Sequence, residues 1–219
     1  MTTLTTSPAA DVLERLFADA VRTGEAFRAR MARTPAEGRD ARGSVDSRAF
    51  YAAAKDTHLA VSRDTARLLY VLARSRGARR VVEFGTSFGV STLCLAAALR
   101  DNGGGTLVGS EYEPTKAEAA RRNLADAGLA DLVEVREGDA LESLAHDLPG
   151  PVDLVLLDGA KDVYLDVLRL LEPRLAPGAL VVADNADRSP EFLAHVRGDA
   201  RYVSSAVGDD VEVAVYTVG

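Results

Sequence analysis

Short apolar runs recur along the chain, and segments with helical spacing separate them. Five of these runs predict buried strands: Arg80–Phe84, Thr106–Glu111, Leu132–Glu137, Val152–Leu157 and Ala179–Ala183. Two further runs, Tyr202–Val207 and Val211–Val218, flank a Gly-Asp-Asp turn and predict a closing hairpin. Strands that alternate with helices form a doubly wound sheet. The pattern therefore predicts an α/β fold with a mostly parallel, seven-stranded sheet that ends in a C-terminal antiparallel hairpin.

The helical spacing places helices between these runs. The first extends from Asp11 to about Met31, and another begins at Arg63, where Ser62 is the expected N-cap. A helix should also open after the glycine turn at Gly89. Later helices are expected at Pro114–Ala127, at Leu141–His146, from the residue after Asp162 to about Leu175, and at Pro190–Val196.

The region before residue 57 differs in composition from the rest. Arg33–Ser47 carries proline, glycine and many charges, which predicts a mobile loop, and Arg48–Lys55 predicts a short helix. We therefore divide the chain into an N-terminal helical cover and mobile loop, residues 1–56, and a main domain, residues 57–219. Two roles stay open for the first helix: a packing cover, or a substrate lid or dimer contact.

Charge and composition exclude several classes of protein. The chain has 219 residues, enough for one α/β domain, and a formal net charge of −7, which argues against a nonspecific nucleic-acid binder. No apolar run reaches the roughly 18 residues of a membrane span, and the first ten residues do not resemble a secretory signal. The single cysteine, Cys94, lies in an apolar helix start, which favours a reducing, cytoplasmic location.

The turn after the first predicted strand is the richest in chemical signal. It reads Glu83-Phe-Gly85-Thr-Ser87-Phe-Gly89. The dinucleotide pattern G-x-G-x-x-G is absent, because Ser87 stands where its middle glycine would be. The turn therefore suits a nucleoside ligand without phosphates, with Glu83 facing a cationic amino-acid portion or sulfonium. The alternative is that the two glycines serve packing alone.

Two later segments add nucleoside-binding groups. Glu111 ends the second strand, where a carboxylate can accept both hydroxyls of a ribose, although it could instead face a helix dipole. Tyr112 follows and could pack on an adenine. Gly138-Asp139-Ala140 follows the third strand, where adenine edges are read, but Asp139 could equally cap the next helix.

Three oxygen donors follow the fourth and fifth strands. Asp158 ends one strand, and Asp184 and Asn185 end the next; Lys161 stands three residues after Asp158. If these strands are neighbours, two carboxylates and an amide oxygen converge, and such a donor set suits Mg²⁺ or another divalent cation. The alternative is that each acid caps a turn or helix.

The three histidines are weaker candidates for a functional site than these acids. His58 precedes a helix in a loop, and a structural or exposed role is favoured over a catalytic one. His195 is expected at the surface or in packing, and His146 at the C-terminal end of a short helix, where a cation suits the dipole.

Taken together, these segments resemble the class I S-adenosylmethionine-dependent O-methyltransferases of the metal-dependent catechol and caffeoyl-CoA type. The similarity runs from about Leu59 to the C-terminus and includes Asp158-Gly-Ala-Lys161-Asp-Val-Tyr164, Ala183-Asp184-Asn185 and the final hairpin. The resemblance implies a Rossmann-like methyltransferase domain that uses S-adenosylmethionine and Mg²⁺ and methylates a hydroxylated aromatic small molecule. It also implies that no nucleic acid or membrane is a partner and that the chain forms a homodimer, with the N-terminal helix as the expected contact.

The resemblance also implies roles for individual residues. Lys161 is the expected general base, and Asp158, Asp184 and Asn185 the metal ligands. The residues expected to line the cofactor site are Val61, Glu83, Gly85, Ser87, Ser91, Glu111, Tyr112, Asp139, Ala140 and Asp158.

Two departures bear on the acceptor. Ala160 stands where the mammalian catechol enzyme has a bulky aromatic wall, and the segment after Asn185 is short. Three alternatives remain: a metal-independent methyltransferase, an NAD-dependent oxidoreductase, which the glycine pattern disfavours, and a module that only binds the cofactor.

Overall fold

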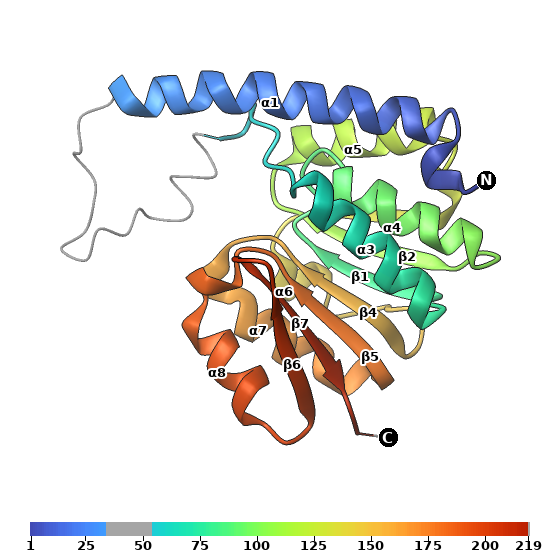
Figure 1. Ribbon diagram of the computed structural model, residues 1–219, viewed down its shortest axis with the longest axis vertical. Helices are drawn as coiled ribbons and strands as arrows, with labels where there is room; N and C mark the ends of the chain where they lie inside the picture. The colour runs from blue at the N-terminus through green and yellow to red at the C-terminus, as the bar shows by residue number, and fades with distance from the viewer. Residues whose placement is uncertain (34–53, 219) are drawn as a thin grey trace.

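The predicted strands assemble into one sheet in the computed structural model, which describes residues 1–33 and 54–218 (Figure 1). Within these residues the sheet has seven strands in the order β3-β2-β1-β4-β5-β7-β6. The strands are β1 (Arg80–Phe84), β2 (Thr106–Glu111), β3 (Val133–Glu137), β4 (Val152–Leu157), β5 (Leu175–Ala183), β6 (Tyr202–Val207) and β7 (Val211–Tyr216). The first five are parallel, and β7 pairs antiparallel with β5 and β6. The predicted fold class is confirmed.

Helices cover both faces of the sheet, as a doubly wound fold requires (Figure 1). On one face lie α1 (Ala9–Arg33), α3 (Arg63–Arg76), α4 (Val90–Asp101) and α5 (Pro114–Asp126). On the other lie α6 (Ala140–Ser143), α7 (Tyr164–Leu171) and α8 (Pro190–Gly198). Short 3₁₀ segments occur at Thr3–Thr5, Ala130–Leu132, Lys161–Val163, Glu172–Arg174 and Ala186–Arg188.

The central helix on the first face, α4, is buried all round because other elements enclose it. Every residue from Val90 to Leu99 is buried, and α3 and α1 pack over it. Cys94 is a free, fully buried thiol in this helix, and burial raises its pKa to about 12, so it behaves as a small apolar side chain. Leu16 of α1 belongs to the same core cluster, so the N-terminal helix packs directly onto the main domain.

Capping residues define both ends of α3. The Ser62 hydroxyl accepts a hydrogen bond from the Thr65 amide at 3.0 Å, which confirms the predicted N-cap. Gly77 ends the helix in the left-handed region with φ of 64°. No helix among the described residues is long and apolar enough to span a membrane. Most of the predicted loop at 33–47 and of the short helix at 48–55 lies outside the described residues, so both stay predictions.

Two helix predictions were wrong. The helix expected at Leu141–His146 ends at Ser143, because the Arg136 guanidinium binds the carbonyl oxygens of Ser143, His146 and Asp147 and holds the chain in a turn. His146 is therefore not at a helix end. The helix expected to reach Leu175 ends at Leu171, since Pro173 introduces a short 3₁₀ turn and Leu175 already belongs to β5.

Candidate functional site

The ends of β4 and β5 meet at the carboxyl edge of the sheet. The two strands are parallel neighbours, and Leu157 pairs with Ala183, so Asp158 and Asp184 leave the sheet side by side. The Asp158 amide donates to the Phe84 carbonyl at 2.8 Å, and the Asp184 amide to the Leu157 carbonyl at 3.0 Å. These bonds extend the ladder by one residue and fix both acids at the edge where ligands bind in open α/β sheets.

The two carboxyl groups form an electrostatically strained pair. Burial raises the pKa of Asp158, and the nearby Lys161 opposes this effect. Burial also raises the pKa of Asp184, and the neighbouring Asp158 carboxylate raises it further. A positive charge bound between the two carboxylates would therefore stabilise their ionised forms.

Lys161 supplies one positive charge at this edge. Its Nζ lies 3.2 Å from Asp158 Oδ1 and donates to the Tyr164 hydroxyl at 2.6 Å. That hydroxyl donates in turn to the Asp184 carbonyl oxygen at 2.9 Å. Tyr164, which is fully buried, thus connects Lys161 to the end of β5. From the sequence, Tyr164 was recognisable only as part of the family motif, and no role was predicted for it.

A further carboxylate reaches this edge from the hairpin turn. Asn185 has a φ of 49°, and its Nδ2 donates to Asp210 Oδ2 at 3.2 Å, while the Asp210 carbonyl accepts from the Ala186 amide. Asp210 also raises the pKa of Asp184. From the sequence, Asp210 was predicted only as a turn residue. Among the described residues, no group of three or more His, Cys, Asp or Glu side chains is arranged to hold a metal ion, so a cation here would depend on two acids and an amide.

The glycine turn packs against the same edge. Gly85 has a φ of 98°, and a Cβ atom at this position would lie 2.5 Å from the Asp158 carbonyl oxygen. Only glycine therefore allows the turn to approach the end of β4 so closely. Gly89, with a φ of 91°, begins α4 against Ala120.

Glu83 lies beneath this turn. Its fully buried carboxylate accepts hydrogen bonds from the hydroxyls of Thr86, Ser91 and Thr92 at 2.9, 2.6 and 2.5 Å. Burial raises its pKa, and the three hydroxyls counteract that effect. The side chain thus faces the start of α4, and its predicted contact with a ligand stays a prediction.

Glu111, the last residue of β2, stabilises the glycine turn through hydrogen bonds. Its Oε2 accepts from the Ser87 amide at 2.7 Å, and its Oε1 from the Glu113 amide at 2.9 Å. Tyr112 beside it is 66% exposed, so its ring is free to meet a ligand. Asp139 caps α6 by accepting from the Leu141 amide at 2.9 Å, and Ala140 is buried behind it. The capping alternative for Asp139 is thus present in the structure, and its adenine role remains untested.

A small cavity lies between the turn and the segment before α3. Its walls include Val61, Ser87 and Ser91, which the sequence analysis had placed at the site, and His58, which it had not. The His58 ring stacks on Phe88 with centroids 3.6 Å apart. The buried Ser87 Oγ and His58 Nδ1 have no hydrogen-bond partner within the described part of the chain. Unpaired buried polar atoms on one cavity fit a polar ligand group.

A wider groove of about 510 Å³ continues from this cavity beneath α1. Its walls include Phe17, Val21 and Phe27 of that helix and His58 opposite. The N-terminal helix is thus a packing cover that also lines a groove, and its role as a substrate lid stays a prediction.

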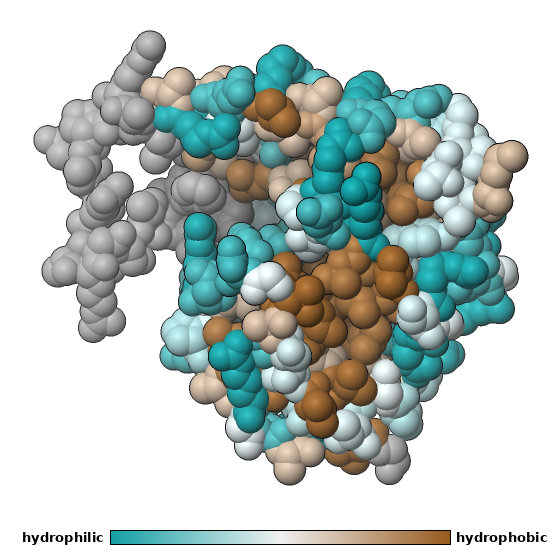
Figure 2. All heavy atoms as spheres, in the orientation of Figure 1, coloured by the Kyte–Doolittle hydropathy of each residue, from teal (hydrophilic) through white to brown (hydrophobic). Residues whose placement is uncertain are grey.

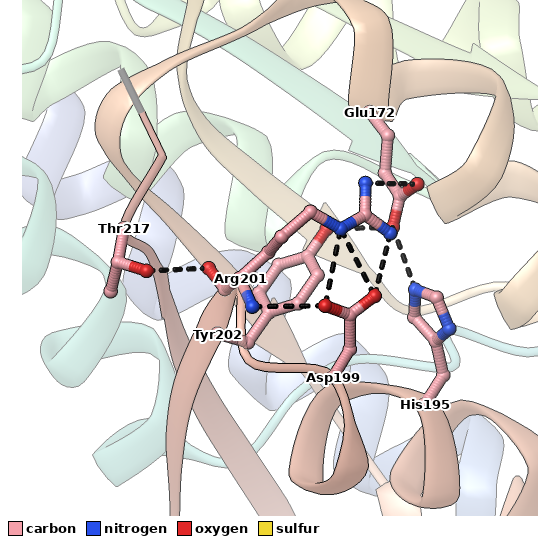
Figure 3. A network of polar contacts seen from close by, with 6 residues as sticks. All are labelled: Glu172, His195, Asp199, Arg201, Tyr202 and Thr217. Atoms are coloured by element: carbon pink, nitrogen blue, oxygen red, sulfur yellow. Dashed lines mark hydrogen bonds and ion pairs between the residues drawn. The ribbon is translucent and has the colours of Figure 1, made fainter.

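His195 belongs elsewhere, as predicted. It packs against Tyr202 and bonds to Glu172, in a network that joins α8 to the root of the C-terminal hairpin (Figure 3).

Comparison with known proteins identifies the family. A family model described as a methyltransferase domain matches residues 82–186. Catechol O-methyltransferase of Mycobacterium tuberculosis is 40% identical over 142 residues, a match that spans 65% of this chain and 64% of that protein. Catechol O-methyltransferase of Sus scrofa is 31% identical over 74% of this chain and 95% of its own.

A solved structure agrees with these matches. The O-methyltransferase TomG from Streptomyces achromogenes, in complex with SAM, is 32% identical and superposes with a TM-score of 0.67, covering 80% of this chain and 92% of its own. The chain therefore belongs to the class I S-adenosylmethionine-dependent O-methyltransferases, within the catechol O-methyltransferase-like family.

Proposed function

We propose that this protein transfers a methyl group from S-adenosylmethionine to one hydroxyl of a catechol-like aromatic molecule, with Mg²⁺ or another divalent cation as cofactor. The observation that carries the proposal is the position of Lys161, 3.2 Å from Asp158, where the ends of β4 and β5 meet the glycine turn. A small-molecule acceptor and a cytoplasmic location are part of this proposal.

The amino-acid end of the cofactor is proposed to lie at the small cavity beside the glycine turn. This polar end would pair the unsatisfied Ser87 Oγ and meet the N-terminal amides of α4, with Val61 and Ser91 on either side. The Glu111 carboxylate would hold the ribose, Tyr112 would cover the adenine, and Asp139 and Ala140 would border the adenine edge. Glu83 supports this site from below, through the hydroxyls that shape the start of α4.

The donor set at the sheet edge fits a hard divalent cation. Asp158, Asp184 and Asn185 offer two negative charges and an amide oxygen, and the mutual repulsion of the acids disappears when a cation binds. Such an ion, when bound, lowers the pKa of a coordinated hydroxyl and orients the acceptor. Two adjacent hydroxyls provide the bidentate contact that this arrangement favours.

Lys161 would accept the proton of the attacking hydroxyl. The acceptor oxygen would bond to the methyl carbon of S-adenosylmethionine as the carbon–sulfur bond breaks. The electron pair of the broken bond would return to the sulfonium sulfur, which leaves S-adenosylhomocysteine as the product. Lys161 has the position that a general base needs, because its amine lies at the edge where the acceptor hydroxyl would bind. The Tyr164 hydroxyl, which bonds to both Lys161 and the Asp184 carbonyl, would keep the amine aimed at the acceptor.

Methyl transfer from labelled S-adenosylmethionine to a panel of vicinal diphenols tests the proposal. We expect transfer with Mg²⁺, loss of transfer with excess EDTA, and recovery when Mg²⁺ is restored. Transfer that persists in EDTA would replace the metal mechanism with the metal-independent alternative. A chain that binds NAD and not S-adenosylhomocysteine would contradict the whole assignment.

Ser87→Ala separates ligand binding from stability. Because its buried hydroxyl is unpaired without ligand, the substitution should leave the free energy of unfolding unchanged or slightly higher. The affinity for S-adenosylhomocysteine should fall by about 10-fold, as expected for a lost hydrogen bond to a charged group. Calorimetric titration and thermal unfolding measure the two quantities. Ser143→Ala is the matched control, since its buried Oγ is also unpaired but does not line the cavity; equal losses in both variants would refute the Ser87 role.

A further inference from the structure

The turn of the C-terminal hairpin differs in composition from the strands that it joins. One side of β6 and β7 carries five valines and Ser205, and Figure 2 shows a hydrophobic area over β5, β7 and β6 on the side that faces the viewer. The turn between the two strands reads Gly208-Asp209-Asp210, and both of its acids are exposed. Because Ala183 of β5 pairs with Glu212 of β7, this acidic turn lies beside the segment that follows β5.

Two hydrogen bonds join Asp210 to the segment that follows β5. Its backbone carbonyl accepts from the Ala186 amide at 2.7 Å, and its Oδ2 accepts from Asn185 Nδ2 at 3.2 Å. The first bond involves only backbone atoms, so it does not depend on the Asp210 side chain. The second bond is made by the carboxylate itself, and it contacts the side chain that is proposed to offer an amide oxygen to the cation.

The backbone of Asn185 is held in one conformation. Its φ of 49° lies in the left-handed region, which asparagine adopts more readily than most residues. Its carbonyl accepts from the Arg188 amide at 3.1 Å, and the amides of Asp184 and Ala186 on either side of it are also hydrogen-bonded. The orientation of the side-chain amide is therefore the main freedom left to this residue, because the outer torsion of an asparagine side chain has a broad energy minimum.

We infer that Asp210 is a positioning residue, which binds the nitrogen of the Asn185 amide and so leaves the amide oxygen available to a divalent cation. An ionised carboxylate only accepts hydrogen bonds, so the group of Asn185 that faces it must be the NH₂. The oxygen lies on the other branch of the same planar amide. Turning the amide over would set this oxygen against the Asp210 carboxylate and offer the cation a nitrogen that only donates. The inference rests on the proposed function, because it requires a cation beside Asn185.

Asp210 acts through Asn185 and is not itself a metal ligand in this arrangement. Its Oδ2 is bonded to the Asn185 amide, and the described residues contain no group of three or more His, Cys, Asp or Glu side chains placed to hold a metal ion. The amide oxygen is one of the proposed donors, so a wrongly turned amide would weaken the site directly. Residues that orient a metal ligand in this way commonly contribute about 10- to 100-fold in metal affinity.

Binding of Mn²⁺ alone, followed through the paramagnetic resonance signal of the free ion, tests this inference without any methyl transfer. Asp210→Ala should raise the Mn²⁺ dissociation constant by about 10- to 100-fold. Its melting temperature without metal should stay close to that of the wild type, because the side chain is exposed and the backbone bond to Ala186 remains. Asp210→Asn keeps an acceptor oxygen without the charge and should recover most of the affinity. When Asn185→Ala is already present, Asp210→Ala should have little further effect, since the side chain that it positions is gone.

Asp209→Ala is the matched control. It removes the same charge from the same turn, but Asp209 makes no hydrogen bond or ion pair within the described part of the chain, so the Mn²⁺ affinity should stay within about 3-fold of the wild type. An Asp210→Ala protein that binds Mn²⁺ like the wild type overturns the inference. So does equal weakening by Asp209→Ala or by Asp210→Asn, which would show that charge alone matters. These results leave the proposed function intact, whereas a wild-type chain that binds neither Mn²⁺ nor Mg²⁺ refutes the proposed metal site and this inference with it.

Discussion

Lys161→Ala should lower the rate of methyl transfer at saturating acceptor by about 10²- to 10⁴-fold, the usual contribution of a positioned general base. The amine lies 3.2 Å from Asp158 and 2.6 Å from the Tyr164 hydroxyl, and no other lysine of the described residues makes a hydrogen bond or ion pair at this edge. Single-turnover measurements with labelled S-adenosylmethionine report the chemical step directly. The affinity for S-adenosylhomocysteine should change little, because Lys161 does not line the cavity beside the glycine turn.

Two companion variants make this result specific. Lys161→Met keeps the apolar stem and should be as inactive as Lys161→Ala, which would exclude lost packing as the cause. Tyr164→Phe keeps the amine but removes the hydroxyl that orients it, so about a 10-fold loss of rate is expected together with a shifted pH profile. A Lys161→Ala protein within a few-fold of the wild-type rate would remove the lysine from the mechanism.

The sequence predicted those parts of the site that depend on periodicity and on the order of elements. Strand ends can be predicted because an apolar run stops at a polar residue. Asp158, Asp184 and Glu111 were therefore placed correctly at the ends of their strands. Parallel strands present these ends at one edge, which is why acids distant in sequence were expected to converge. The pairing of Leu157 with Ala183 then supplied the adjacency that the sequence could only assume.

Other parts depend on contacts that no local pattern encodes. Asp210 reads as an ordinary turn residue, and only the antiparallel pairing of β7 with β5 brings it beside Asn185. The Glu83 carboxylate turns inward because three hydroxyls around the start of α4 can satisfy it there. The early end of α6 results from Arg136, on a neighbouring strand, which binds carbonyl oxygens that a longer helix would have used.

Gly85→Ala should destabilise the fold and weaken cofactor binding together. The added Cβ would lie 2.5 Å from the Asp158 carbonyl oxygen and 2.8 Å from the Gly159 amide nitrogen, and both belong to backbone that cannot rotate away. The φ of 98° adds strain for any residue with a side chain. We expect a loss of about 3 to 5 kcal/mol of unfolding free energy, from overpacking and backbone strain combined, and a melting temperature lower by about 10 °C.

Gly104→Ala separates these two causes. Gly104 has nearly the same φ, 102°, but no atom lies within 4 Å of its added Cβ, so this variant should lose only the conformational part, about 1 to 2 kcal/mol, and should bind S-adenosylhomocysteine normally. The difference between the variants measures the close approach of the glycine turn to the end of β4. Equal destabilisation would mean that backbone conformation alone requires glycine at position 85, and the turn could then move away from Asp158 without loss. The opposite outcome is a larger loss of unfolding free energy at Gly85 together with weaker S-adenosylhomocysteine binding. It would show that stability and ligand binding both require the close contact between the glycine turn and the end of β4.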